Sequence, residues 1–276
     1  MTGSLAYNKD YAFNAICPYF TMFPLEYPLR LLKKHKADDP VVLDPFCGSG
    51  GTVLASVLEG RKAIGLDRSP AAVFIANQHC EPVDPAELDR ATRELMDEVG
   101  PELDWLYETR CDRCGGKART VMTVFSERFR CARCGREVPL LDCIRMEDCA
   151  ASGKKRKLRA CPHCRRDGAI EAISTRAERL GAAPVLVEYE CANGCTPSRA
   201  QRRYNDPDPR RRDFFDRYDL GKIDEIARRE IPYWHPTVEF PTTFARWKTD
   251  LRAAGIRSVA DLYTKRNLWA LAAIRQ

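Results

Sequence analysis

The sequence lacks the features that would place it in several classes of protein. No stretch reaches the roughly 18 consecutive apolar residues that a membrane-spanning helix needs. The first ten residues have neither the basic nor the apolar region of a secretory signal. Apolar residues make up 44% of the chain and charged residues 30%, a balance that excludes a wholly disordered protein. We therefore expect a folded cytoplasmic protein with no membrane partner.

Cysteine and positive charge are concentrated in the middle of the chain. Ten of the thirteen cysteines lie between Cys111 and Cys195. Residues 111–212 hold 23 Lys and Arg against 13 Asp and Glu, a balance of +10, whereas the other 174 residues hold 22 against 26, a balance of −4. In a reducing compartment, clustered cysteines indicate metal sites rather than disulfides. An insert with its own chemistry is expected, with boundaries near residues 105 and 213.

A strand signal followed by a glycine-rich turn begins at residue 41. Val41–Leu43 is a short apolar run that stops at Asp44, and residues 45–51 contain the turn formers Pro, Gly and Ser. Thr52 is expected to cap the helix that follows, and Gly60 is expected to lie just past its end.

A second strand signal follows that helix. Residues 62–66 are predicted to be a strand that ends at Asp67, and Ser69 with Pro70 marks the start of the next helix. A further helix is expected from Asp84 to Gly100. The order predicts a βαβ unit of a parallel sheet, and hence a partial Rossmann-like (doubly wound) α/β fold with an inserted domain.

The loop between the strand and the helix favours one class of cofactor. Glycines let the backbone approach a ligand, and an acid at the tip of the next strand can accept hydrogen bonds from a ribose. No lysine follows the glycines, as an ATP-binding loop would require, and Val53 stands where a dinucleotide fingerprint needs its last glycine. S-adenosylmethionine remains, although a plain turn between strand and helix is the alternative.

Two segments resemble a known enzyme family. Asp44-Pro-Phe-Cys-Gly-Ser-Gly-Gly-Thr52 is similar to the cofactor loop of the class I S-adenosylmethionine-dependent DNA amino-methyltransferases, the adenine-N6 and cytosine-N4 group. Residues 17–28 resemble the segment that closes over the methionine end of the cofactor, unless their aromatics are core residues. The resemblance implies a DNA methyltransferase in which Asp67 binds the ribose and Arg68 the adenine edge. The implied cofactor-binding residues are Tyr19, Phe23, Asp44, Phe46, Cys47, Gly48, Ser49, Gly50, Thr52, Asp67 and Arg68.

The insert contains four pairs of cysteines, each pair spaced as the two ligands of a zinc knuckle. Cys111 and Cys114 are followed after sixteen residues by Cys131 and Cys134, which predicts one site of four thiolates. The second predicted site combines Cys161 and Cys164 with Cys191 and Cys195. We expect two structural zinc ions in two zinc ribbons, since four protein ligands leave no position for a substrate. Cys143, Cys149 and His163 are not expected to be ligands, and the alternative is that one of them replaces a cysteine of a site.

Basic residues flank the second predicted ribbon. They are Lys154, Lys155, Arg156, Lys157 and Arg159 before it, and Arg199, Arg202, Arg203, Arg210, Arg211 and Arg212 after it. Such clusters suit a phosphate backbone, so DNA is the expected partner, and a solvated loop is the alternative. RNA is also possible, because both polymers present phosphates. Tyr233, Trp234 and His235 could stack on a base, although a packed turn is the commoner role of such a cluster.

The catalytic tetrad of the resembled family, Asp/Asn/Ser-Pro-Pro-aromatic, is absent from the 276 residues. The last residues resemble the helix that precedes the catalytic strand, with Thr264 as its cap and Leu268, Leu271 and Ala272 on its apolar side. No catalytic residue can be assigned. We expect a split or truncated amino-terminal part that needs a second polypeptide for catalysis, because an unfinished sheet leaves an exposed edge.

The resemblance implies three segments. Residues 1–104 would be the cofactor-binding half of the methyltransferase domain, residues 105–212 the zinc-ribbon insert and residues 213–276 a helical return to the first domain. The alternative hypothesis is a non-catalytic zinc-ribbon subunit that binds DNA or regulates another protein. The two hypotheses differ in whether the chain binds S-adenosylmethionine.

Overall fold

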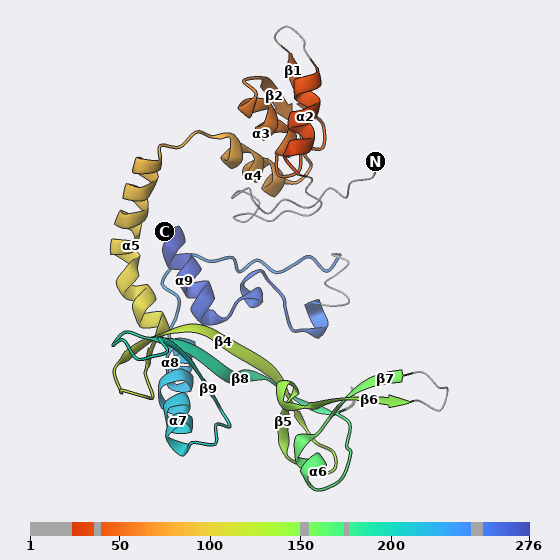
Figure 1. Ribbon diagram of the computed structural model, residues 1–276, viewed down its shortest axis with the longest axis vertical. Helices are drawn as coiled ribbons and strands as arrows, with labels where there is room; N and C mark the ends of the chain where they lie inside the picture. Colours follow the sequence, from red (N-terminus) through yellow and green to blue (C-terminus); the bar gives the residue numbers. More distant parts are fainter. Residues whose placement is uncertain (1–23, 36–39, 150–154, 174–176, 244–250) are drawn as a thin grey trace. The chain divides into compact units, whose positions relative to one another are not determined.

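The computed structural model describes residues 24–35, 40–149, 155–173, 177–243 and 251–276 (Figure 1). The chain divides into two compact units, Met1–Ala91 and Thr92–Gln276. No described helix is both long enough and apolar enough to cross a membrane.

The first unit is a small α/β structure. Its elements are α2 (Glu26–Lys34), β1 (Val41–Asp44), α3 (Gly51–Leu58), β2 (Lys62–Gly65) and α4 (Pro70–Cys80). β1 and β2 are parallel and in register, with Val41 beside Lys62 and Asp44 beside Gly65. Because α3 connects two parallel strands, the predicted βαβ order is present. Leu25, Leu32 and Ala55 form the buried centre of this unit.

The caps of the first unit agree with the sequence at α4 and differ at α3. Ser69 caps α4, since its hydroxyl accepts a hydrogen bond from the N–H of Ala72 at 3.4 Å. Thr52, the predicted cap of α3, lies inside that helix. Gly50 is the capping residue and has a left-handed backbone with φ +88°. A side chain at the cap is therefore not needed, because the glycine itself makes the turn.

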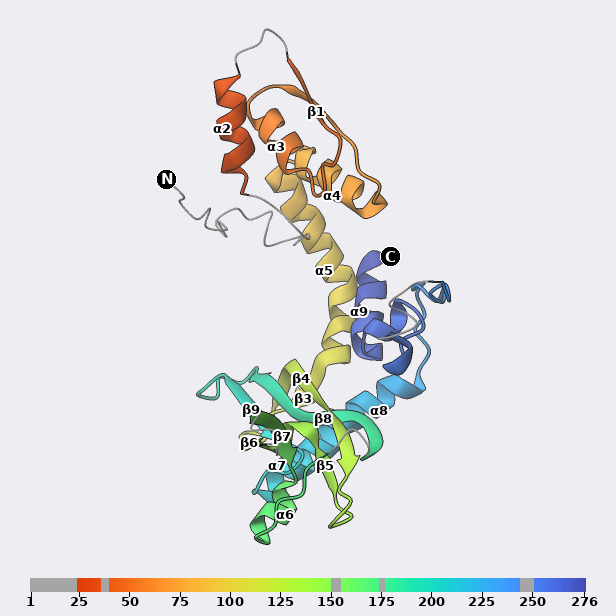
Figure 2. The same ribbon diagram turned by 90° about the vertical axis from the view of Figure 1, so that its right-hand side faces the viewer.

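The second unit is built on an antiparallel sheet. Its strands are β3 (Glu108–Arg110), β4 (Lys117–Arg130), β5 (Glu137–Pro139), β8 (Glu178–Cys191) and β9 (Arg199–Arg203), in the order β3-β4-β8-β9 with β5 beside β4. β6 (Ile144–Cys149) and β7 (Lys155–Ala160) form a separate hairpin. β4 and β8 lie side by side along their length in both views (Figures 1 and 2).

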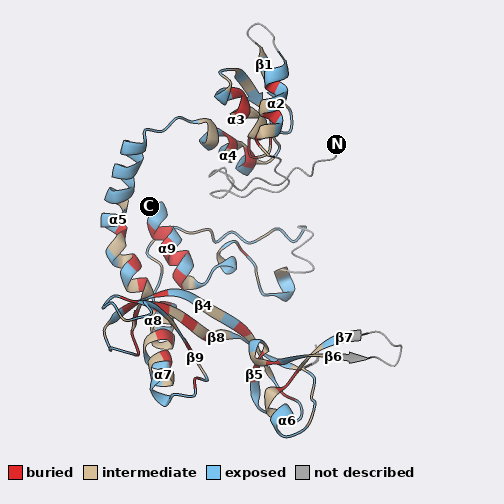
Figure 3. Cartoon of the chain, viewed as in Figure 1, coloured by how far each residue is buried: buried red, intermediate tan, exposed pale blue. Residues whose placement is uncertain are grey.

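Several helices accompany this sheet. They are α5 (Pro85–Tyr107), α6 (Pro162–Arg166), α7 (Pro209–Phe214), a π-helical segment (Phe215–Leu220), α8 (Gly221–Arg228), a 3-10 turn (Ala260–Leu262) and α9 (Lys265–Arg275), with another 3-10 turn at Leu140–Asp142. Leu103 and Leu106 of α5, Ile226 of α8 and Trp269 of α9 pack in one buried cluster. Figure 3 shows α5 exposed along its first half and buried toward its end.

α5 is longer than the sequence suggests. The helix was expected to end near Gly100, but it continues to Tyr107 with Pro101 inside it. Val99, Leu103 and Leu106 are all buried. Burial of this face outweighs the one backbone hydrogen bond that a proline removes from a helix.

The carboxyl-terminal helix has the predicted cap and a different apolar face. Thr264 caps α9 by accepting a hydrogen bond from the N–H of Asn267. Leu268 and Ala272 are buried as predicted, but Leu271 is 49% exposed and Trp269 is buried instead. The indole N–H of Trp269 donates to Glu102 at 2.8 Å, which fixes the face that turns toward α5.

The aromatic cluster before Pro236 belongs partly to the same packing. Tyr233 packs against the buried cluster and its hydroxyl donates to Glu102 at 2.5 Å. Trp234 is 63% exposed, with the guanidinium of Arg275 4.2 Å above its ring. Tyr233 is thus part of the packed core of this unit and is not available to stack on a base.

Candidate cofactor and metal sites

The glycine loop continues the pairing of β1 and β2 past their ends. The N–H of Leu66 donates to the carbonyl of Asp44, and the N–H of Cys47 donates to the carbonyl of Leu66, both at 2.9 Å. Gly48 has φ +52° and Gly50 has φ +88°, values that favour glycine. The loop therefore turns sharply at the carboxyl edge of the two strands, where parallel sheets bind their ligands.

Gly50 also packs closely against Ala76 of α4. A Cβ on Gly50 would lie 2.7 Å from the Cβ and 2.9 Å from the Cα of Ala76. We expect Gly50→Ala to destabilise the first unit by about 2 to 4 kcal/mol, because it adds a clash with backbone to an unfavourable positive φ. Urea unfolding measures this loss. Gly60→Ala, at φ +70° with open space around it, should cost only about 1 to 2 kcal/mol, and equal losses would contradict the close approach.

Asp67 joins the loop to the start of α4. Its Oδ2 accepts a hydrogen bond from the N–H of Gly48 at 3.0 Å, and its Oδ1 accepts one from the N–H of Ser69 at 2.8 Å. Each carboxylate oxygen has a further lone pair. The carboxylate is thus fixed at the loop and can still accept hydrogen bonds from the hydroxyls of a ligand.

The other predicted residues of the loop differ in exposure. Phe46 is 87% exposed, and its N–H donates to the carboxylate of Asp44 at 3.1 Å. Arg68 is exposed and Thr52 is half-buried. Tyr19 and Phe23 lie outside the described residues. The exposed guanidinium of Arg68 is next to Asp67 in sequence, and the exposed ring of Phe46 is on the loop that the Asp67 carboxylate contacts through Gly48.

Two predicted residues point into the protein. The thiol of Cys47 is buried against Gly65, where a Cβ would lie 3.1 Å from its sulfur. Burial raises the pKa of Cys47, and the nearby carboxylates of Asp44 and Asp67 add to the effect. Ser49 is buried too, and its carbonyl lies 3.0 Å from Nδ1 of His79. The contact with His79 was not predicted, since no sequence pattern links residues thirty positions apart.

The eight predicted metal ligands gather into two groups of four. One group is Cys111, Cys114, Cys191 and Cys195, and the other is Cys131, Cys134, Cys161 and Cys164. Sulfur atoms within a group lie within 4.8 Å of one another. The predicted combination of pairs is therefore wrong, since each group takes one pair from each predicted site.

The antiparallel pairing of β4 with β8 explains the exchange. β4 has 14 residues, so its two flanking cysteine pairs are roughly 45 Å apart and cannot share an ion. β8 runs back along it, placing Cys191 beside Ala118 and Glu178 beside Arg130. At one end of the β4–β8 ribbon, Cys111 and Cys114 therefore meet Cys191 and Cys195. At the other end, Cys131 and Cys134 meet Cys161 and Cys164.

The spacing of the thiols fits a tetrahedral ion. Four sulfurs at about 2.3 Å from zinc lie about 3.8 Å from one another. The sulfur–sulfur distances are 3.7 Å for Cys114–Cys191, 4.0 Å for Cys111–Cys195, 3.6 Å for Cys131–Cys164 and 3.8 Å for Cys134–Cys161. These groups could hold metal ions. Cys143 packs beside the second group but is not one of its four members.

Backbone N–H groups lower the pKa of two thiols, those of Cys111 and Cys131, each the first cysteine of its pair. Burial raises the pKa of Cys111, but hydrogen bonds from the N–H groups of Cys114 and Arg113 lower it overall to about 6. The same balance, with N–H groups of Cys134 and Arg133, lowers the pKa of Cys131 to about 7. These hydrogen bonds favour the thiolate of Cys111 and of Cys131, and the thiolate is the form that binds metal.

A buried ion pair stabilises the sheet beside the first cysteine group. Arg202 of β9 is fully buried, and its guanidinium donates to both carboxylate oxygens of Asp219, at 2.5 and 2.7 Å. It also donates to Thr109 at 2.6 Å and to the carbonyl of Arg110 at 2.7 Å. The guanidinium lies 4.7 Å from the ring centre of Tyr189. Arg202, predicted to contact phosphate, is instead a structural residue.

Asp219→Ala should destabilise the second unit by about 3 to 5 kcal/mol, since it leaves the Arg202 guanidinium buried without its partner. Urea unfolding of the metal-loaded protein measures the change. Asp213→Ala is the matched control, because its pair with Arg217 is exposed and should change stability by less than about 1 kcal/mol. Similar effects for the two variants would contradict a structural role for the buried pair.

Three neighbouring arginines are likewise engaged within the fold. Arg203 pairs with Asp142 at 2.8 Å, Arg211 pairs with Asp206 at 2.9 Å, and Arg212 donates to the carbonyl of Asp206. The sequence alone predicts free positive charges here, because it does not show which carboxylates and carbonyls these arginines contact. The arginine cluster of residues 199–212 therefore contributes less to a phosphate-binding surface than its composition suggests.

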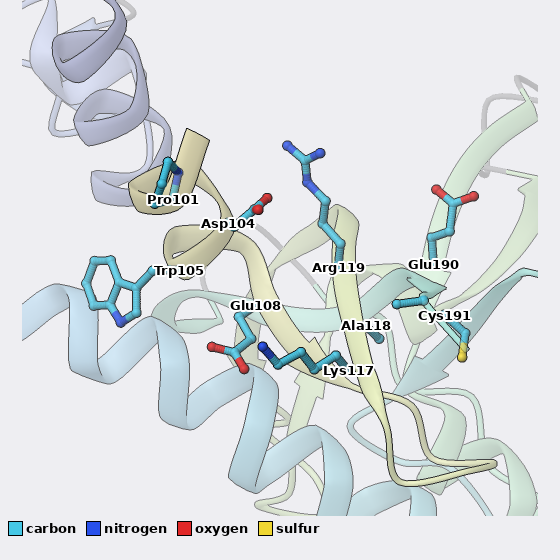
Figure 4. Close-up of a pocket in the computed structure, with 10 residues that line it drawn as sticks. Pro101, Asp104, Trp105, Glu108, Lys117, Ala118, Arg119, Glu190 and Cys191 are labelled. Carbon is cyan, nitrogen blue, oxygen red and sulfur yellow. The ribbon is translucent and has the colours of Figure 1, made fainter. Parts of the chain in front are cut away.

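Another cleft of the second unit is lined by residues of α5, β3, β4 and β8. It has a volume of about 530 Å³ at the end of α5, and Figure 4 shows Asp104, Glu108, Lys117, Arg119 and Glu190 around it. Three carboxylates and two cations give this cleft no excess of positive charge. It also contains none of the residues predicted to bind the cofactor.

Two comparisons with known proteins match part of the chain. Residues 5–78 match the model of a family described as DNA methylase, the N6/N4 methyltransferases. Type II methyltransferase M.BglI of Bacillus subtilis is 39% identical over 59 residues, which cover 21% of this chain and 17% of that protein. No solved structure matches the chain. Residues 5–78, which contain the glycine loop and Asp67, are thus similar to the adenine-N6/cytosine-N4 DNA methylase family, and the chain covers only a small part of the matched relative.

Proposed function

We propose that the chain is the amino-terminal part of an S-adenosylmethionine-dependent DNA amino-methyltransferase with a Rossmann-like core. The carboxylate of Asp67 carries this proposal. It is held between the N–H groups of Gly48 and Ser69 at the carboxyl edge of two parallel strands, with lone pairs free for ribose hydroxyls. Exposed Phe46 and Arg68 would contact the adenine, and the family resemblance adds Tyr19 and Phe23 at the methionine end.

The sheet of the first unit supports a requirement for a further part of the enzyme. Val41, Leu43, Ile64 and Leu66 are 55%, 60%, 52% and 54% exposed, so an apolar strip of β1, β2 and the residue after β2 faces solvent. Large exposed apolar patches mark interaction surfaces. Because the sequence also lacks the catalytic tetrad, we assign the missing strands and the tetrad to another part of the protein or to a second polypeptide.

Two structural zinc ions would hold the second unit together. The four thiols of each group have the spacing of a tetrahedral site in which protein ligands fill every position. When bound, zinc would supply folding free energy rather than chemistry, because protein ligands fill all four positions. The ribbon of β4 and β8 would then be fixed at both ends.

The hairpin of β6 and β7 is the element best suited to a DNA backbone. Arg145 lies directly opposite Arg159 in the hairpin register. Like charges facing each other across two strands repel, and an anion between them removes the repulsion. In the complete enzyme the target base would leave the duplex, since its amine cannot otherwise reach the methyl group.

Arg145→Ala should weaken duplex DNA binding and reduce the slope of log affinity against log salt by about 0.9, the value for one phosphate contact. Fluorescence anisotropy across a salt series measures both. Arg217→Ala, which removes an exposed arginine already paired with Asp213, is the control and should leave the slope unchanged. An unchanged slope for Arg145→Ala would remove the hairpin from the DNA interface.

Calorimetry with S-adenosylhomocysteine, the product form of the donor, tests the proposed function. The zinc-loaded chain should bind one molecule and should show no comparable binding of ATP, whose phosphates need the lysine that this loop lacks. Absence of binding at millimolar concentration would favour the other interpretation, a zinc-containing subunit that binds DNA without catalysis.

A further inference from the structure

A second cavity of the larger unit contains a buried arginine whose Nε has no hydrogen-bond partner among the described residues. This groove has a volume of about 330 Å³ and lies between β4, α8 and the first turn of α9. Met122 and Phe125 of β4 and Ile223 of α8 line its apolar walls, and Arg266 of α9 lines its polar end. It shares no residue with the cysteine groups or with the glycine loop.

Arg266 is only 8% exposed. Its guanidinium lies 5.5 Å from the ring centre of Tyr107, but its Nε has no hydrogen-bond partner in the described structure. Asp219 is near enough to attract it, yet the oxygens of Asp219 already accept hydrogen bonds from Arg202 and Thr109. A buried N–H donor without an acceptor is costly, and no carboxylate oxygen among the described residues accepts from this one, so the orphaned Nε indicates a missing acceptor, for which a carboxylate is suited.

Other donors converge on the same end of the groove. Thr264 caps α9, and the N–H groups of Lys265 and Arg266 begin a helix, where they have no acceptor within it. Helix amino termini attract negative charge. Thr123 of β4 also lines the groove, and its buried hydroxyl has no hydrogen-bond partner among the described residues. Arg266 and Thr123 thus independently lack a partner in one cavity.

The walls of the groove favour a protein ligand over a nucleic acid. Val121, Met122 and Phe125 are 42%, 44% and 41% exposed, so an apolar surface leads to the buried cation. The neighbouring Lys265 is engaged, since its Nζ donates to the carbonyl of Ala227 at 2.9 Å. A phosphate backbone carries many charges and would need several free cations. A single carboxylate among apolar side chains complements this surface in charge and in polarity.

We propose that the groove binds a segment of a partner polypeptide in which one Asp or Glu stands among apolar residues, with the carboxylate against Arg266, Thr123 and the amino terminus of α9. The apolar side chains of the segment cover Met122, Phe125 and Ile223. This interaction does not depend on cofactor binding or methyl transfer.

Selection from a phage-displayed library of random 12-residue peptides on the zinc-loaded chain tests the proposal. Enriched peptides should share an acidic residue flanked by apolar residues. Their affinity should fall at least about 10-fold on Arg266→Met, the loss expected for hydrogen bonds to a charged group. Replacing the acidic residue of the peptide by its amide should cause a similar loss.

The controls separate recognition from folding. Arg275→Met removes an arginine from the same helix outside the groove and should leave the affinity unchanged. Arg266→Met should melt at a temperature equal to or above that of the natural chain, because it removes a buried donor that has no acceptor, whereas a structural arginine would lower the melting temperature. Thr123→Val, which keeps the side-chain shape, should also weaken binding.

Three results would overturn the proposal. The first is enrichment of peptides without an acidic residue, and the second is equal binding to the natural chain and to Arg266→Met. The third is a selection that yields no peptide, together with binding of mixed-sequence DNA that is lost in Arg266→Met. This result would assign the groove to nucleic acid.

Discussion

Replacing Asp67 with alanine is expected to lower the affinity for S-adenosylhomocysteine by about 100-fold or more. Two hydrogen bonds from ribose hydroxyls to a carboxylate contribute about 1.5 to 3 kcal/mol each, and both would be lost. The substitution also frees the N–H groups of Gly48 and Ser69 that the carboxylate holds in place. Calorimetry on the zinc-loaded chain measures the change.

A matched variant separates binding from folding in this experiment. Asp84→Ala removes another carboxylate of the first unit, one that accepts a hydrogen bond from the N–H of Ala86 at the start of a helix. Asp84→Ala should lower the free energy of unfolding about as much as Asp67→Ala does, by about 1 kcal/mol, but should leave the affinity for S-adenosylhomocysteine unchanged. Equal affinity of Asp67→Ala and the natural chain would remove Asp67 from the cofactor site.

Paired cysteine substitutions should reveal which pairs share an ion. Cys114→Ser with Cys195→Ser removes two ligands from one group and leaves the other complete, so one zinc should resist a mild chelator. Cys114→Ser with Cys134→Ser takes one ligand from each group, so both ions should be lost. The sequence-based combination predicts the reverse for the two double variants. Mass spectrometry of the metal content after chelation distinguishes the outcomes.

Complete removal of zinc should unfold much of the second unit. Structural zinc in small peptides binds with about 10 to 16 kcal/mol of free energy, which is as large as the whole stability of a typical domain, about 5 to 15 kcal/mol. The groups lie at the two ends of the β4–β8 ribbon, so loss of the ions would release both ends. Circular dichroism before and after chelation measures the loss of strand signal. An unchanged spectrum would show that the thiol groups are not required for the fold.

Local features of the chain could be predicted from the sequence. The two strands, the glycine loop between them and the cap at Ser69 depend on neighbouring residues, and the structure contains all of them. Asp67 was expected at the tip of the second strand and lies beside the loop. Such features follow from short-range rules for turns and caps, which a single sequence contains.

Long-range features could not be predicted in the same way. The spacing of the cysteines gives the pairs but not their combination, which depends on the antiparallel register of β4 and β8. Arg202 was grouped with exposed arginines because its partner, Asp219, lies on another element. Arg266 had no sequence signal at all, since its unusual property is that its Nε lacks a hydrogen-bond partner among the described residues.

The most direct test of cofactor binding is a crystal structure of the chain with S-adenosylhomocysteine. The account predicts ribose hydroxyls within about 3 Å of the Asp67 carboxylate, with the ligand against the backbone of Gly48. A ligand bound at another place, or a loop closed by its own side chains in the presence of saturating ligand, would contradict it.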